Sequence, residues 1–244
     1  MTIGEKLYEG KAKIVYATDD PTVLLTYFKD DATAFNAQKR GQIQDKGRIN
    51  CTISTHLFRI LEAQGVPTHW LETPSEREMR VKALTIIPLE VVVRNVAAGS
   101  LCRATGLPQG LPLNPPLVEF YYKRDDLGDP LLTADRLRLL NLASEEQIHT
   151  LRRQALSINQ ILTNFFATCD ITLVDFKLEF GLDAHQNILL GDEISPDTCR
   201  LWDRSVEDEA QRVMDKDRFR QDLGQVEAAY QRVLDRVVAQ SSKN

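Results

Sequence analysis

The chain has 244 residues, of which 43% are hydrophobic and 27% charged, and its formal net charge at pH 7 is −5. This composition is typical of an ordinary soluble globular protein, long enough for one large domain or two lobes, and it excludes a fully disordered chain. A pI of about 5.5 argues against binding nucleic acid or an anionic membrane through overall charge. We therefore expect small-molecule partners and no nucleic-acid partner.

The cysteines show no metal or disulfide pattern. They are widely separated, with no Cys-x-x-Cys pair, at Cys51, Cys102, Cys169 and Cys199. Neither a zinc site nor a disulfide framework is indicated. The first residues lack the apolar run of a signal peptide, and the longest apolar stretch, 83–93, contains Pro88 and Glu90. We expect a cytoplasmic protein with no membrane-spanning segment.

The first third of the chain predicts a small α+β lobe. Residues 6–17 form two β-rich runs around Gly10, a pattern typical of a hairpin, and 22–29 predicts a third strand. In residues 46–63 apolar side chains recur every three or four positions, which predicts a helix. These elements define an N-terminal lobe with a small antiparallel sheet, residues 1–84.

The remaining residues, 85–244, predict a larger α/β C-terminal lobe. It begins with a strand at 86–93. An amphipathic helix is expected over 151–165, and a long helix over 219–237 should close the chain against the sheet. The expected fold class is α+β, with two lobes and a cleft between them.

Residues 173–181 carry the strongest signal for a functional site. Their strict alternation predicts a strand with Asp175, Lys177 and Glu179 on one face. The opposite face holds the apolar side chains Val174, Phe176, Leu178 and Phe180. Alternate residues are about 6 to 7 Å apart, so this charged row can hold a metal ion, a phosphate and a polar substrate together. The alternative is the solvent-exposed face of an antiparallel sheet.

A second acidic turn follows the charged row. The short apolar run before Gly191 predicts a returning strand, which would bring Asp192 beside Glu179. Proteins commonly hold Mg²⁺ with one or two carboxylates, phosphate oxygens and waters. The sequence therefore predicts a magnesium site at Glu179 and Asp192.

The hairpin turn at residues 10–13 is a candidate phosphate clamp. Gly10 lets backbone amides approach an anion, while Lys11 and Lys13 supply positive charge. An ordinary tight turn remains the alternative, because turns favour glycine for conformational reasons.

Residues 86–100 contain ionisable groups among apolar neighbours. Glu90 and Arg94 would share a face of a regular strand. The guanidinium there could bind a phosphate through two parallel hydrogen bonds, with Ser100 completing the site. A structural salt bridge of Arg94 with a carboxylate is the alternative. Arg200 is a second possible anion ligand, with a surface role as its alternative.

Together, these segments resemble the sequence motifs of the SAICAR synthetase family. Residues 86–100 and 173–181 resemble the family's two signature motifs, and 7–13 resembles its glycine-rich opening. Residues 190–203 and 214–220 are similar to its later acidic segment and to the start of its C-terminal helix. The resemblance spans nearly the whole chain in order. One departure is Ala37, where the family pattern has glycine.

The resemblance implies a two-lobed SAICAR synthase-like fold with the nucleotide in the cleft. It also implies ligation of L-aspartate to the carboxylate of 5-amino-4-carboxyimidazole ribonucleotide (CAIR), with ATP converted to ADP and phosphate, in de novo purine biosynthesis. The carboxylate would first become an acyl phosphate. A homodimer is expected from the family. The alternatives are another kinase-like or ATP-grasp-like ligase, and a catalytically inactive nucleotide-binding protein.

The resemblance also implies roles for individual residues. Glu179 and Asp192 would bind Mg²⁺ and the nucleotide, and Lys82 would contact the adenine. The nucleotide phosphates would contact Gly10, Lys11, Ala12 and Lys13.

The substrate side has its own set of implied contacts. The 5′-phosphate of the ribonucleotide would be bound by Arg94, Ser100 and Arg200. Glu90 would face the aminoimidazole edge. The expected catalytic residues are Lys177, between the metal and substrate sides, and Asp175, which would act near the reacting groups as a general base or only as an orienting group.

Overall fold

The first sheet of the protein is five-stranded and antiparallel. The structure, a computed structural model, describes residues 3–34 and 38–241. In the order β1-β2-β3-β7-β6, the strands are β1 (Ile3–Glu9), β2 (Lys13–Thr18), β3 (Val23–Phe28), β7 (Glu78–Lys82) and β6 (Trp70–Ser75). The predicted hairpin and third strand are therefore confirmed. Ala37 lies outside the described residues, between β4 (Asp31–Ala34) and β5 (Lys39–Gln42).

Helix α1 (Lys46–Ala63) has the bounds that its hydrophobic spacing predicts. Its stripe of Ile49, Ile53, Leu57 and Leu61 is fully buried, because positions three and four apart share one helix face. The chain leaves the helix through Gly65, whose backbone lies in the left-handed region and whose N–H donates to the Glu62 carbonyl.

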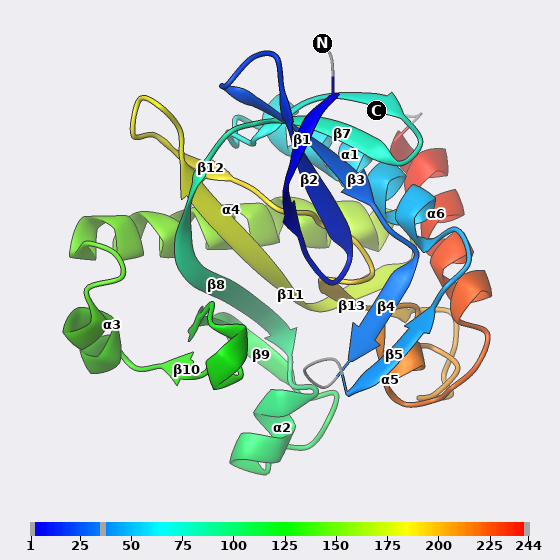
Figure 1. Cartoon of the computed structure of the whole chain (residues 1–244). Helices are drawn as coiled ribbons and strands as arrows, with labels where there is room; N and C mark the ends of the chain where they lie inside the picture. Colours follow the sequence, from blue (N-terminus) through cyan, green and yellow to red (C-terminus); the bar gives the residue numbers. More distant parts are fainter. Residues whose placement is uncertain (1–2, 35–37, 242–244) are drawn as a thin grey trace.

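The second sheet is larger and also antiparallel. Its order is β10-β9-β8-β11-β12, with β13 paired to β11 as well. The strands are β8 (Thr85–Val96), β9 (Pro112–Tyr122), β10 (Leu131–Leu132), β11 (Ile171–Leu182), β12 (Ile188–Leu190) and β13 (Cys199–Asp203). Figure 1 shows this sheet beside the first, with the β1–β2 hairpin in front.

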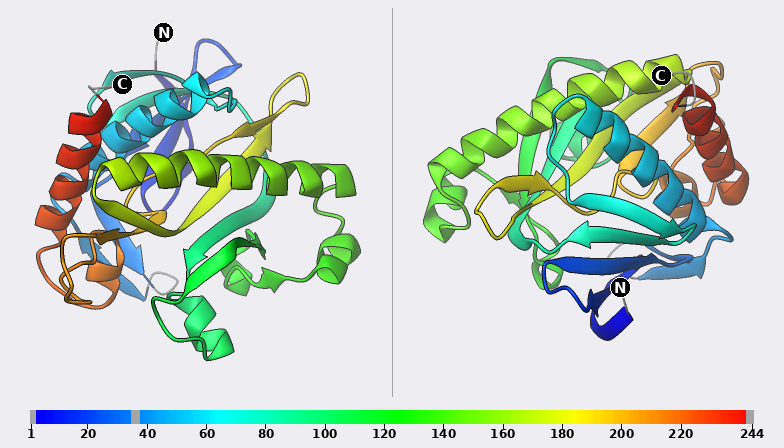
Figure 2. Two further views of the ribbon diagram at one scale, coloured as in Figure 1. Left: turned by 180° about the vertical axis from the view of Figure 1, so that it is seen from behind. Right: turned by 90° about the horizontal axis from the view of Figure 1, so that it is seen from above.

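The helices lie mainly behind the sheets. Helix α4 (Glu145–Thr168) crosses the back of β8 and β11 (Figure 2). It begins at a capping box, in which Ser144 and Gln147 each accept a hydrogen bond from the other's backbone N–H. The shorter helices are α2 (Ser100–Thr105), the 3₁₀ turn η1 (Asp125–Leu127) and α3 (Ala134–Leu140). Among the described residues, no helix has the length and apolar character needed to cross a membrane.

The C-terminal segment differs from the prediction of one helix packed on the sheet. It forms α5 (Asp217–Arg220) and α6 (Val226–Ser241), separated by a turn that contains Gly224 with φ of 70°. Helix α6 packs against α1, because Tyr230 and Val233 join the same core as the apolar stripe of α1. That core runs through both sheets. The boundary at 84/85 falls between β7 and β8, and the division into two lobes stays a prediction.

Strand β11 positions the functional site. It pairs with β8 along one edge and with β12 and β13 along the other. The segment 191–198, between β12 and β13, therefore leaves the sheet next to the middle of β11. Gly191 N–H donates to the Glu179 carbonyl at 2.9 Å, and Lys177 N–H donates to the Thr198 carbonyl at 2.9 Å. The acidic turn is thus fixed beside the charged row.

A β-bulge near the start of β11 corrects one expectation. The pairing with β13 shifts register between Leu173 and Asp175, which breaks the strict alternation. Leu173 packs in the main core with Phe176, whereas Val174 packs in a separate cluster with Trp202. The prediction that Val174 lies on the same face as Phe176 is therefore wrong.

Candidate active site

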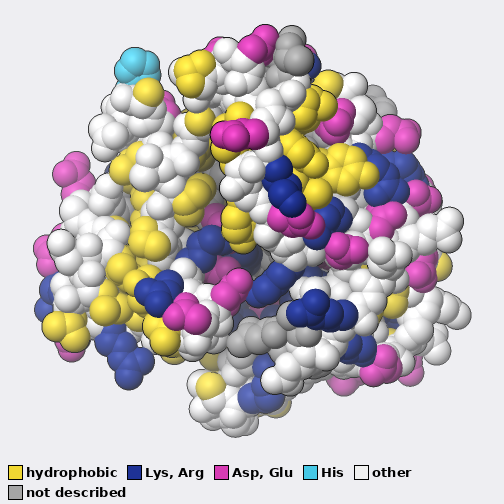
Figure 3. Space-filling view, in the orientation of Figure 1, with side chains coloured by type: hydrophobic (Ala, Val, Ile, Leu, Met, Phe, Trp, Pro, Cys, Tyr) yellow, Lys and Arg dark blue, Asp and Glu magenta, His cyan; other side chains and the backbone are white. Residues whose placement is uncertain are grey.

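A cavity of about 500 Å³ lies between the β1–β2 hairpin and the second sheet. Positive and negative side chains line it in equal number. The cations are Lys11, Lys13, Arg94, Lys123, Lys177, Arg200, Lys216 and Arg220. The acids are Glu90, Asp125, Asp129, Asp175, Glu179, Asp192, Glu193 and Asp197. Lys, Arg and acidic side chains surround a hollow on this face of the molecule (Figure 3). A polyanionic ligand that enters the cavity can replace these carboxylates as the ion-pair partner of the cations.

The charged row of β11 faces this cavity. Asp175 and Glu179 are each only 4% exposed, so the row is not a solvated sheet face. Lys177 Nζ lies 2.5 Å from Glu179 Oε1, 3.0 Å from Glu90 Oε1 and 3.6 Å from Asp192 Oδ2. The expected proximity of Asp192 to Glu179 is confirmed, and Lys177 occupies the point where the carboxylates converge.

Lys177 is a permanent cation in this setting. Burial alone would lower its pKa, but the carboxylates of Glu179, Asp192 and Glu90 outweigh burial and raise the pKa well above its ordinary value. The ammonium therefore stays protonated at neutral pH. It can stabilise developing negative charge, and it cannot act as a general base.

The donor set around Lys177 fits magnesium. Glu179 and Asp192 both reach the Lys177 ammonium, so their oxygens lie close to a common point. Among the described residues no group of three or more His, Cys, Asp or Glu is placed to hold a metal. Two carboxylates with substrate phosphates and waters are nevertheless the usual magnesium environment. Burial would raise the pKa of Asp192, but Lys13 and Lys177 lower it, so its carboxylate is ionised and available as a ligand.

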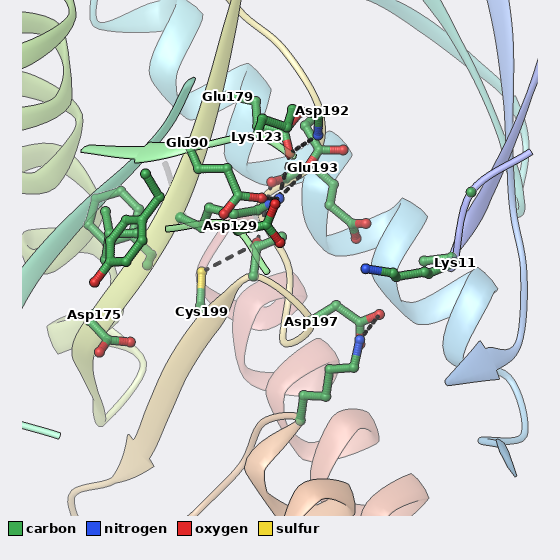
Figure 4. Close-up of a pocket in the computed structure, with 18 of the residues that line it drawn as sticks. Lys11, Glu90, Lys123, Asp129, Asp175, Glu179, Asp192, Glu193, Asp197 and Cys199 are labelled. Atoms are coloured by element: carbon green, nitrogen blue, oxygen red, sulfur yellow. Dashed lines mark hydrogen bonds and ion pairs between the residues drawn. The ribbon is translucent and has the colours of Figure 1, made fainter. Parts of the chain in front are cut away.

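The glycine hairpin covers the carboxylate site. The Gly10 N–H donates to the Lys13 carbonyl at 2.8 Å and closes the turn. From this turn Lys13 reaches Asp192 and also Glu193, the latter at 3.1 Å. Burial opposes the charge of Lys13, yet both acids raise its pKa above the ordinary value. Lys11 extends from the hairpin toward the cavity (Figure 4), and its Nζ lies 2.7 Å from Asp125 Oδ1. All four residues from Gly10 to Lys13 line the cavity.

Arg94 is held by a buried network on the opposite side. Its side chain is 3% exposed. Its Nη1 donates to Asp175 at 2.7 Å, and its Nε donates to Glu119 at 2.7 Å. Its Nη2 donates to Ser100 Oγ at 3.0 Å and to the Tyr121 hydroxyl at 3.1 Å. The planar fork is thus fixed in one orientation, as anion recognition requires.

Arg200 approaches Asp175 from β13. Its Nη1 donates to both carboxylate oxygens of Asp175, at 3.0 and 2.8 Å. Gly99 makes this position possible, because a Cβ at residue 99 would lie 2.3 Å from Arg200 Nη2. Asp175 therefore joins two guanidinium groups, with Ser100 bonded to one of them. The sequence-predicted set Arg94, Ser100 and Arg200 is brought together around Asp175.

Lys82 is the one predicted site residue outside the cavity lining. It lies at the end of β7, and its Nζ is 3.5 Å from the Thr68 carbonyl. No described contact joins it to the charged row, so its contact with adenine stays a prediction.

The sequence analysis missed several residues of the cavity. Lys123 Nζ lies 2.6 Å from Glu179 Oε1, and Tyr121 pairs with Glu90 across β8 and β9. The alternation of Glu119, Tyr121 and Lys123 is the same period-two signal as the charged row and could have located them. The other missed charged residues lie on loops, in the η1 turn or at the short α5, where no such signal exists: Asp125, Asp129, Glu193, Asp197, Lys216 and Arg220.

Comparisons with known proteins point to one family over nearly the whole chain. Residues 6–237 match the profile of the family described as SAICAR synthetase. A phosphoribosylaminoimidazole-succinocarboxamide synthase of Acaryochloris marina is 65% identical over 240 residues, which cover 98% of each chain. The crystal structure of such a synthase from Ehrlichia chaffeensis aligns with a TM-score of 0.92 at 42% identity, covering 96% of this chain and 99% of that one. A structure described as SAICAR synthetase (Type-2) in complex with ADP aligns with a TM-score of 0.90 at 44% identity, covering 95% and 97%.

Proposed function

This chain belongs to the SAICAR synthetase family, and we propose that the cavity around Lys177 performs the family's reaction with the residue roles given below. The enzyme ligates L-aspartate to the carboxylate of CAIR in purine biosynthesis, with ATP as the energy source. The observation that carries the proposed roles is the position of Lys177. Its permanent positive charge lies between a glycine–lysine hairpin and two arginines, the buried Arg94 and the partly buried Arg200.

The chemistry explains why the reaction needs such a cation. A carboxylate is a poor acyl donor, so its oxygen attacks the γ-phosphorus of ATP, releases ADP and forms an acyl phosphate. The aspartate amine then attacks the acyl carbon and expels phosphate, while the amine loses a proton. Lys177 stabilises the negative charge on the transferring phosphoryl group, because a fixed cation in a buried site acts more strongly than one in water.

The nucleotide phosphates bind on the hairpin side. Lys11 and Lys13 contact the phosphate oxygens, while Gly10 and Ala12 let the backbone approach them. In the structure Lys13 pairs with Asp192, and the proposal requires that phosphate oxygens replace part of this pairing. Glu179 and Asp192 hold Mg²⁺, which supplies charge neutralisation at the phosphates. The ADP complex of a similar structure supports nucleotide binding in this fold.

The ribonucleotide binds on the arginine side. Arg94, Ser100 and Arg200 converge on Asp175, and the 5′-phosphate takes the place of that carboxylate as their anionic partner. Asp175 is then released to orient the reacting groups. Glu90, a partner of Lys177, faces the aminoimidazole edge.

The remaining assignments concern the cell compartment, the assembly, the two lobes and Lys82. The four cysteines are free thiols, in keeping with a reducing cytoplasm. The family resemblance supports a homodimer, a nucleotide-binding N-terminal lobe over 1–84, a substrate-binding lobe over 85–244, and adenine contact by Lys82.

An ADP-release assay tests the proposed function. With ATP, Mg²⁺, CAIR and L-aspartate, we expect sustained ADP release, and omission of L-aspartate should leave only slow release. The riboside that lacks the 5′-phosphate is the matched control and should react far more slowly, because it cannot contact Arg94 and Arg200. An equally fast reaction with the riboside would contradict the arginine assignment. ATP binding without turnover would contradict the enzyme assignment itself.

A further inference from the structure

Two neighbouring cations of the cavity, Lys216 and Arg220, have no role in the proposed function. Lys216 immediately precedes α5, and Arg220 is the last residue of α5. The Arg220 N–H donates to the Lys216 carbonyl at 2.9 Å, so the two residues are one helical turn apart. Side chains at this spacing project from the same side of a helix. Both line the cavity.

The charge of Lys216 is poorly compensated. Its ion pair with Asp197 is 3.6 Å long. Asp197 already accepts closer contacts, at 2.8 Å from the buried Lys46 ammonium and at 2.7 Å from the Tyr230 hydroxyl. Burial, together with the positive charges of Lys46 and Arg220, lowers the pKa of Lys216 despite Asp197. An anion that binds beside such a partly buried cation stabilises its charge.

The Arg220 guanidinium also has N–H donors that can bind an anion. Among the described residues its side chain makes one hydrogen bond, from Nη1 to Asp217 at 2.5 Å. A guanidinium has five N–H donors and accommodates a carboxylate through two parallel hydrogen bonds. Part of this side chain is open to solvent, with 33% of its surface exposed. A ligand entering the cavity can therefore reach it.

The pair lies beside the residues assigned to the ribonucleotide. Asp217 accepts from Arg220 and also from Arg200 Nε at 2.7 Å, so one carboxylate separates Arg220 from the arginine assigned to the 5′-phosphate. On the other side, the Lys216 N–H donates to the Pro196 carbonyl, and Thr198 in the same loop accepts from the Lys177 N–H. The pair thus lies between the ribonucleotide-phosphate cluster and the acidic segment beside Lys177.

We propose that Lys216 and Arg220 bind the carboxylates of L-aspartate. This assignment rests on the proposed function, which requires a second anionic substrate close to the ribonucleotide. Two cations one turn apart suit a small dicarboxylate, whereas the assigned partners of ATP and CAIR are other residues. The competing ligand for the same two cations is the ribonucleotide 5′-phosphate.

Kinetics of Lys216→Gln and Arg220→Gln distinguish these ligands. We expect each change to raise the KM for L-aspartate by about tenfold or more, as for loss of a hydrogen bond to a charged group. The dissociation constants of CAIR and ATP, measured by titration, should change less than about twofold. Succinate, which has both carboxylates and no amine, should lose affinity as a competitive inhibitor in parallel with L-aspartate.

Two further variants keep the test decisive. Lys216→Arg retains the charge and should recover most of the affinity for L-aspartate, which a folding defect would not allow. Arg153→Gln, on the exposed face of α4, is the matched control and should leave every constant unchanged.

Three results would overturn the assignment. These are an unchanged KM for L-aspartate, an equal loss of CAIR affinity, or unaltered inhibition by succinate. If the unmodified protein showed no aspartate-dependent turnover, the proposed function would fail together with this assignment.

Discussion

Replacing Glu179 by Gln or Asp192 by Asn is expected to lower kcat by at least about 100-fold while the protein remains folded. Each change removes one negative charge from the proposed magnesium site and keeps the size of the side chain. The two more buried cations keep other partners, because Glu90 still contacts Lys177 and Glu193 still contacts Lys13. Lys123, which pairs with Glu179, is 41% exposed and can be solvated instead. The loss should therefore appear in activity much more than in stability.

Activity measured against Mg²⁺ concentration, with circular dichroism and thermal unfolding, tests this expectation. The variants should need more Mg²⁺ for their residual rate, because each has lost a ligand. Glu227→Gln, an exposed position on α6, is the control and should behave as the unmodified protein. A near-normal rate of either site variant at low Mg²⁺ would show that these carboxylates do not bind the metal.

Arg94→Lys is expected to weaken CAIR binding by about 2 kcal/mol or more and to leave ATP binding nearly unchanged. Lysine keeps the positive charge but loses the fork that contacts Asp175, Glu119 and Ser100. Without that fork the position can still attract a phosphate but cannot orient it through two parallel hydrogen bonds.

Separate titrations of the two ligands decide between two roles for Arg94. Equal losses for CAIR and ATP would indicate a structural ion pair that holds β8, because a distorted strand would affect both sides of the cavity. Arg103→Lys, on the exposed side of α2, provides the matched control, and its affinities should match those of the unmodified protein.

The sequence predicted the helices and strands whose apolar side chains recur at a regular spacing. Helix α1 spans 46–63 as its apolar stripe indicates, and β11 presents Asp175, Lys177 and Glu179 to one cavity. The alternation failed only at Val174, where a bulge depends on pairing with β13, a strand that follows more than ten residues later. A period-two pattern contains no information about such a register shift.

Contacts between segments that are distant in the sequence could not be predicted from local patterns. Arg94 pairs with Asp175, 81 residues away, and Lys46 pairs with Asp197, 151 residues away. Which carboxylate reaches which cation depends on how α1, α5 and the loop 191–198 pack, and no local spacing encodes that. The prediction that the C-terminal helix covers the sheet failed for the same reason. The apolar periodicity around Tyr230 indicates that one helix face is buried. It does not indicate that α1 is the element that packs against this face.

The central claim is that this cavity activates the CAIR carboxylate by phosphoryl transfer, and an isotope experiment tests it most directly. CAIR labelled with oxygen-18 in its carboxylate is converted with ATP and L-aspartate, and the released phosphate is analysed by mass spectrometry. Phosphoryl transfer places a carboxylate oxygen on phosphorus, and amine attack then expels that oxygen with the phosphate. The account predicts one labelled oxygen in each phosphate formed from fully labelled carboxylate. Phosphate free of the label would contradict acyl phosphate formation and the role assigned to Lys177.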